Sequence, residues 1–151
     1  MSTTEKRDGG FSVTTVIAAT PQQLYDAWTV EQDLNGWLAT TSETDARAGG
    51  QYILHWPMPE GELSARGEYL ELVPGRKIVQ SWESWGPNGR MDGMDATVTV
   101  EFRDLGDGTT EMIQSETSPA YTTGDHMDKS IGGTIEVHKG LATFIASKSG
   151  T

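Results

Sequence analysis

The apolar residues of this chain change their period once, and that change limits the folds the chain can adopt. In the body of the chain, apolar and polar side chains alternate, as at Val98 and Val100, which is typical of half-buried strands. Towards the C-terminus, apolar residues recur at helical spacing from Met127 to Ile145. This spacing predicts one long helix over about 124–148. The pattern therefore favours an α+β fold in which a sheet packs against a C-terminal helix.

Local signals predict the other elements. A β-branched run indicates a first strand at 11–19, and Thr20-Pro21 with Gln23 predicts a capping box that begins a short helix. The same pattern at Thr29 predicts a second short helix that ends at Asn35-Gly36. Short loops then join the remaining strands into an antiparallel meander. These strands are predicted at 51–56, 65–73, 76–85, 97–103 and 109–117.

A length of 151 residues suits one domain with a sizeable core. Residues 1–10 are polar and predict a disordered tail, which leaves 11–149 as a single domain. No apolar run approaches the ~20 residues that a membrane span needs, so no membrane insertion is expected. The absence of cysteine excludes disulfides and thiolate metal sites, and it fits a cytoplasmic location.

Charge and motifs exclude further classes. The 22 acidic and 11 basic residues give a net charge of −11, which repels phosphate backbones, so no nucleic-acid partner is expected. The sequence contains no calcium loop, phosphate loop or paired-histidine motif. We therefore expect no metal and no cofactor, and we assign no catalytic residue.

Several motifs resemble one known family. Pro21-x-x-Leu24-Tyr25-x-Ala27-Trp28-Thr29 resembles the helical signature of the family named after the activator of the heat-shock protein 90 ATPase. Four motifs follow in the family's order: Gly49-Gly50, Gly67-x-Tyr69-x-Glu71-Leu72-x-Pro74, Trp82-Glu83 and Gly106-Asp107-Gly108-Thr109. The family belongs to the START-like, birch-pollen-allergen-like SRPBCC superfamily, and the resemblance covers residues 11 to 148.

The resemblance implies a helix-grip fold. In that fold, a curved antiparallel sheet of about six to seven strands wraps around the long C-terminal helix, and two short helices follow the first strand. The family commonly carries Gly-Trp at the start of the last helix, where this chain has Ile131-Gly132-Gly133. The missing indole is expected to change one wall of the pocket between sheet and helix.

Aromatic residues are the main functional signal, because ligand pockets are mostly apolar with a few polar groups. Each aromatic side chain could instead fill the core, and His138 could be a satisfied histidine at the core edge. The candidate ligand-binding residues are Trp28, Trp37, Tyr52, Leu54, Trp56, Tyr69, Trp82, Val98, Val100, Ile131, Ile135 and His138.

Three functions remain open. The leading hypothesis is non-catalytic binding of a small hydrophobic or aromatic ligand, which includes lipid, in the cavity between sheet and helix. The second is an enzyme similar to the polyketide cyclases and aromatases that share this fold, with His138 and Tyr69 steering proton transfer. The third, suggested by the family name, is a co-chaperone-like domain that stimulates a chaperone ATPase.

Overall fold

The fold is described from a computed structural model, in which residues 2–91, 95–119, 121 and 124–149 are described. The helices are α1 (Pro21–Thr29), α2 (Glu31–Trp37) and α3 (Gly124–Ser149). The strands are β1 (Ser2–Arg7), β2 (Gly10–Ile17), β3 (Thr41–Thr44), β4 (Gln51–Trp56), β5 (Leu63–Val73), β6 (Lys77–Gly86), β7 (Gly89–Arg90), β8 (Ala96–Asp104) and β9 (Thr110–Thr117).

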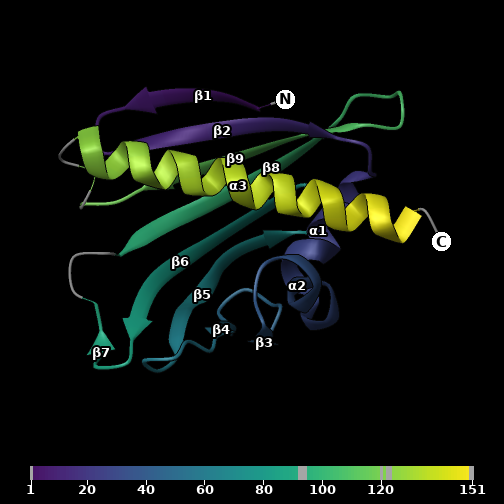
Figure 1. Cartoon of the computed structure of the whole chain (residues 1–151). Helices are drawn as coiled ribbons and strands as arrows, with labels where there is room; N and C mark the ends of the chain where they lie inside the picture. The colour runs from purple at the N-terminus through teal and green to yellow at the C-terminus, as the bar shows by residue number, and fades with distance from the viewer. Residues whose placement is uncertain (1, 92–94, 120, 122–123, 150–151) are drawn as a thin grey trace.

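These strands form one antiparallel sheet in the order β1-β2-β9-β8-β6-β5-β4-β3, with β7 beside β6. The predicted meander is confirmed from β4 onwards, and the early strand β2 pairs with the last strand β9, where Val13 lies opposite Gln114. Figure 1 shows α3 crossing one face of the curved sheet, with α1 and α2 near its C-terminal half. This arrangement is the predicted helix-grip fold, with more strands than the sequence indicated.

The predicted disordered tail over residues 1–10 is wrong. Ser2–Arg7 form β1, which pairs with β2 from Ser2 opposite Thr15 to Arg7 opposite Gly10. Most β1 side chains are exposed, so hydropathy contains no strand signal there, and backbone hydrogen bonds to β2 hold the segment. The short strands β3 and β7 also lie outside the strands predicted from the sequence.

The capping box of α1 is confirmed. Thr20 Oγ1 accepts the Gln23 N–H at 3.1 Å, and Gln23 Oε1 accepts the Thr20 N–H at 2.8 Å. The second predicted box is wrong, because Thr29 still belongs to α1 and its hydroxyl donates to the Tyr25 carbonyl at 2.9 Å. Val30 is the N-cap of α2 without a side-chain hydrogen bond, and the helix continues to Trp37 instead of ending at residues 35–36.

A close approach between strands explains one of the family glycines. Gly67 of β5 lies opposite Tyr52 of β4. An added Cβ at Gly67 would lie 2.0 Å from the Ser81 carbonyl oxygen and 2.7 Å from the Tyr52 ring. The Tyr52 hydroxyl donates to the same carbonyl at 2.5 Å. Glycine is therefore needed here so that the Tyr52 ring can lie over residue 67 and reach the Ser81 carbonyl on β6.

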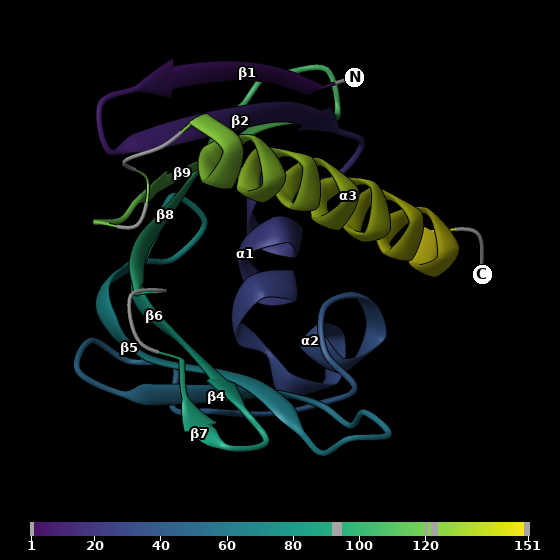
Figure 2. The same cartoon turned by 60° about the vertical axis from the view of Figure 1, so that its left-hand side comes forward.

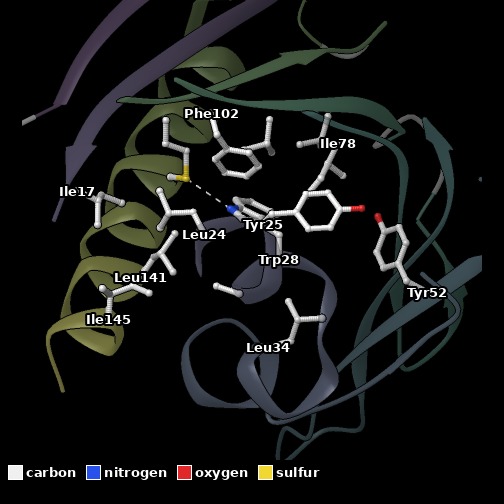
Figure 3. Packing of buried hydrophobic residues seen from close by; sticks show 14 of the residues in the cluster. Ile17, Leu24, Tyr25, Trp28, Leu34, Tyr52, Ile78, Phe102, Leu141 and Ile145 are labelled. Carbon is white, nitrogen blue, oxygen red and sulfur yellow. Dashed lines mark hydrogen bonds between the residues drawn. The ribbon is translucent and has the colours of Figure 1, made fainter. Parts of the chain in front are cut away.

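The apolar core is divided between the two halves of α3. Leu141 and Ile145 pack with Leu24 and Trp28 of α1 in the larger cluster, where Figure 3 shows their side chains converging. A smaller cluster lies between the N-terminal half of α3 and β2. Its buried members are Phe11, Val13, Tyr121, Met127 and Ile131. Apolar contacts thus hold both halves of α3 against the rest of the fold. The cavity lies on the concave side of the sheet, below the first half of the helix.

Candidate ligand-binding site

A cavity of about 280 Å³ lies between the N-terminal half of α3 and the strands β6, β8 and β9. Ligand pockets range upwards from roughly 300 Å³, so this volume suits a small molecule better than a long lipid chain. In Figure 2, α1 and α2 lie on the concave side of the sheet, below α3. The described lining residues are Trp28, Leu38, Trp82, Ser84, Ala96, Gln114, Glu116, Ser118, Tyr121, Ser130, Gly133, Thr134 and Val137.

Two tryptophans supply aromatic walls. Trp28 is buried, and its indole N–H donates to the Met112 sulfur at 3.4 Å, which Figure 3 marks with a dashed line. The ring also meets Trp37 edge to face, with ring centroids 5.1 Å apart. These two contacts fix the Trp28 ring, so its cavity-facing surface is preformed. Trp82 of β6 borders the cavity, and its ring centroid lies 6.3 Å from that of Tyr52.

The polar wall comes from the inward face of β9. Side chains alternate along a strand, so Met112 in the core places Gln114 and Glu116 on the same face, nearer the cavity. Tyr121 donates to Glu116 Oε1 at 2.9 Å, and Gln114 Nε2 donates to Oε2 at 3.0 Å. Thr134 Oγ1 lies 3.4 Å from Oε2, but it also donates to the Ser130 carbonyl at 2.9 Å. A carboxylate therefore faces the cavity with two firm donors.

A chain of hydrogen bonds connects this wall to β2. His138 is fully buried, and its Nε2 lies 2.9 Å from Gln114 Oε1. Its Nδ1 lies 2.7 Å from Thr15 Oγ1, which in turn lies 2.6 Å from Ser2 Oγ. Because Gln114 gives its amide protons to Glu116, its oxygen must accept from His138 Nε2–H. Burial also lowers the pKa of His138, so the imidazole is neutral and its Nδ1 accepts the Thr15 hydroxyl.

Burial shifts the pKa values of this network in opposite directions. The pKa of the Glu116 carboxyl is raised by burial, which the hydrogen bonds from Tyr121, Gln114 and Thr134 partly offset. Burial lowers the pKa of His138 to about 4, in agreement with the neutral tautomer. Burial and the neighbouring Glu116 raise the pKa of the Tyr121 hydroxyl. Among the described lining residues, Glu116 is the only one that carries a carboxyl group.

The structure places only some of the sequence-predicted site residues at this cavity. Trp28 and Trp82 line it, and His138 lies one hydrogen bond behind the lining residue Gln114. Trp37 and Trp56 instead anchor chain segments, because their indole N–H groups donate to the Ala27 and Leu38 carbonyls at 2.8 Å. The predicted residues that fill the main core are Tyr52, Leu54, Tyr69, Val98 and Val100.

Ile131 and Ile135 of α3 point elsewhere for a geometrical reason. They belong to the small cluster with Phe11 and Val13, so they face β2. Successive helix residues are rotated by about 100°, so a different stripe of α3 faces the cavity: Ser130, Gly133, Thr134 and Val137. At Gly133 an added Cβ would meet no atom within 4 Å. The family's missing indole therefore falls where the cavity wall has free space.

Sequence reasoning missed the polar wall. Gln114 and Glu116 look like surface residues in a hydropathy pattern, and Tyr121 follows the last strand. A signal was present for the first two, because alternation from Met112 puts residues 114 and 116 on the inward face. For the enzyme hypothesis, neither Tyr69 nor His138 lines the cavity. Tyr69 packs against Tyr52 with ring centroids 5.4 Å apart.

A second hollow, of about 450 Å³, lies next to the cavity. It is bordered by Ser81, Glu83, Thr97 and Thr117, and it shares Trp82, Ala96 and Ser118 with the cavity. It is the more open of the two. The smaller cavity is the better candidate site, because it combines aromatic walls with a buried carboxylate.

Within residues 2–91, 95–119, 121 and 124–149, no group of at least 3 His, Cys, Asp or Glu side chains is arranged to hold a metal ion. In the same described part of the chain, no helix combines the length and apolar character needed to cross a bilayer.

Comparison with solved structures supports the fold. CalU16 from Micromonospora echinospora superimposes with a TM-score of 0.73 at 18% identity, over 99% of this chain and 87% of that one. DynU16, from the dynemicin biosynthetic locus, gives a TM-score of 0.79 at 14% identity, over 94% of this chain and 49% of that one. At these identities the similarity establishes the architecture alone.

Comparison with characterised sequences identifies the family. A mouse protein, "Activator of 90 kDa heat shock protein ATPase homolog 2", is 33% identical over 70 residues. The match covers 46% of this chain and 19% of the mouse protein, so the chain spans a small part of that relative's length. The family described as "Activator of Hsp90 ATPase homolog 1-like protein" matches residues 18–146. The chain therefore belongs to the family of Activator of Hsp90 ATPase homolog 1-like proteins.

Proposed function

We propose that this chain binds a small apolar or aromatic molecule in the cavity below α3, without transforming it. The observation that carries the proposal is a cavity of about 280 Å³ whose wall includes two indole rings, Trp28 and Trp82. Aromatic and aliphatic walls with a few convergent polar groups are typical of ligand sites. The volume favours a compact ring system over a long acyl chain.

The arrangement of the polar residues supports the non-catalytic part of the proposal. A general base must reach the proton that it removes. The His138 nitrogens are both engaged, with Thr15 at 2.7 Å and Gln114 at 2.9 Å. His138 therefore supports the wall instead of contacting a bound molecule.

The test fills the cavity from α3. Gly133→Phe places a ring at the cavity wall, and Gly132→Phe is the matched control, because Gly132 is exposed and does not line the cavity. Native mass spectra would be recorded before and after incubation with mixed aromatic metabolites and lipids. We expect one-to-one capture by the wild type and by Gly132→Phe, and loss of capture by Gly133→Phe. A wild-type chain that captures no member of the mixture would contradict the proposal.

A second function is favoured by the sequence match to the mouse ATPase activator homologue over 70 residues. In this alternative the domain contacts a chaperone and raises its ATP turnover. The measurement is the steady-state ATPase rate of a purified Hsp90 with and without an excess of this chain. A rate that does not change would remove this alternative and leave the ligand-binding proposal unaffected.

A further inference from the structure

We propose that Glu116 selects the ligand, and that the molecule which fits is an apolar or aromatic body carrying a protonated amine. The inference rests on the proposed function, because it assumes that the cavity is the binding site. It adds the charge of the ligand and the residue that recognises it.

The first argument is the hydrogen-bonding capacity of the carboxylate. An ionised carboxylate offers about four acceptor positions on its two oxygens. The firm donors are Tyr121, at 2.9 Å from Oε1, and Gln114, at 3.0 Å from Oε2. The Thr134 hydroxyl is shared with the Ser130 carbonyl. Acceptor capacity therefore remains on a side chain that borders the cavity, and only a ligand with a donor can use it.

The second argument is charge. No Lys or Arg is among the described lining residues, and Glu116 is the one carboxyl group there, so its ionised form gains no cationic partner from the lining. His138, the nearest basic side chain in the network, is fully buried and held neutral. The Glu116 charge thus has no cationic partner within the hydrogen-bond network. A buried charge is costly unless it is paired, and a bound ammonium would supply the missing partner.

The third argument is the aromatic wall beside the carboxylate. Trp28 and Trp82 border the same cavity as Glu116, and the faces of indole rings attract cations. A ligand carboxylate would instead meet a like charge at Glu116 and gain no donor from a cationic side chain. Apolar amines are therefore favoured, neutral analogues are weaker, and apolar acids are excluded.

The experiment compares three probes with one apolar body: phenylpropylamine, phenylpropanol and phenylpropanoate. Isothermal titration calorimetry at neutral pH would give their affinities for the wild-type chain. We expect the amine to bind at least about tenfold more tightly than the alcohol, since a charge-assisted hydrogen bond replaces a neutral one. We expect no measurable binding of the carboxylate.

Two variants test whether Glu116 causes the preference for the amine over the alcohol. Glu116→Gln keeps the shape of the side chain and removes its charge, so the amine and the alcohol should then bind with affinities within about threefold of each other. Glu101→Gln is the control, because Glu101 is an exposed carboxylate on β8 away from the cavity. It should keep the wild-type preference. Circular dichroism of each variant establishes that it is folded.

The outcomes separate this inference from the proposed function. If the alcohol binds the wild type as tightly as the amine, or if Glu116→Gln keeps the amine preference, the inference is wrong and the cavity is still a binding site. If none of the three probes binds, the inference is wrong, and the capture experiment described above decides the proposed function separately. The wild-type comparison decides between amine and alcohol even where the Glu116 variant does not fold.

Discussion

The two halves of α3 lie in different surroundings. On the C-terminal half, Leu141 and Ile145 enter an apolar core that α1 helps to close. Between its N-terminus and its middle, Thr134 borders a cavity, and His138 joins a hydrogen-bond network that extends from Ser2 to Glu116. The same helix therefore stabilises the fold at one end and lines a candidate site at the other. The difference follows in part from α2, which packs beside the C-terminal half of α3 (Figure 1).

The largest contrast in unfolding free energy is expected from truncating two apolar side chains of α3, one in the core and one beside the cavity. Leu141 is fully buried, so Leu141→Ala should cost about 2–5 kcal/mol of unfolding free energy. Val137 is half-buried and borders the cavity, so Val137→Ala should cost only about 1 kcal/mol. Urea denaturation of both variants measures the difference. Equal losses would show that the cavity side is packed as tightly as the core.

The next contrast lies within the polar network and depends on pH. The folded chain holds the pKa of His138 at about 4, against an ordinary value of 6.5. The unfolded chain therefore binds more protons between these values, and the stability contributed by neutral His138 is lost as the pH falls from about 6.5 to about 4. The complete shift corresponds to about 3 kcal/mol.

Glu116 changes the stability of the fold with pH in the opposite direction to His138. Its folded pKa is raised, so the folded chain takes up that proton first and gains stability as the pH falls through the raised value. Urea midpoints measured from neutral to acidic pH should show a smaller acid loss in His138→Gln and a larger one in Glu116→Gln. Parallel pH curves for the two variants would mean that neither group is buried as described.

The smallest effects come from two glycines, Gly36 of α2, which faces the C-terminal half of α3, and Gly133 beside the cavity. An added Cβ at Gly36 of α2 would lie 2.4 Å from the ring of Phe144 on α3, so Gly36→Ala should lose about 1 kcal/mol through overpacking. At Gly133 a Cβ meets no atom within 4 Å, so Gly133→Ala should gain up to about 1 kcal/mol from helix propensity. Melting temperatures that shift in the same direction would contradict the described difference between the two ends.

The elements that form the core were predictable from the sequence, because local patterns of apolar and capping residues encode them. The stripe from Met127 to Ile145 gave the helix, and the Thr20 capping box gave the start of α1. Strand alternation gave β8 within a residue at each end. In each case, the side chains that hold the element are also the ones that generate the pattern.

The cavity and the sheet edge were not predictable in the same way. Alternation from Met112 places Gln114 and Glu116 on the inward face, but their hydropathy is that of surface residues, so hydropathy does not mark them as cavity residues. Ser2–Arg7 pair through the backbone while most of their side chains remain exposed, and exposed polar side chains resemble a disordered tail. Which stripe of α3 faces the cavity depends on the rotation of the helix over β2, which local sequence does not specify.

The stripe of α3 that borders the cavity has a consequence for how specificity can diversify. Ser130, Gly133 and Val137 lie on successive turns of one helix face, and the core residues Leu141 and Ile145 continue that face further along the helix. A combinatorial library restricted to these three codons would reshape the pocket while sparing the residues on which folding depends. Evolution could use the same separation along the helix, so that paralogues of this domain acquire new ligands through a few substitutions on one helix face.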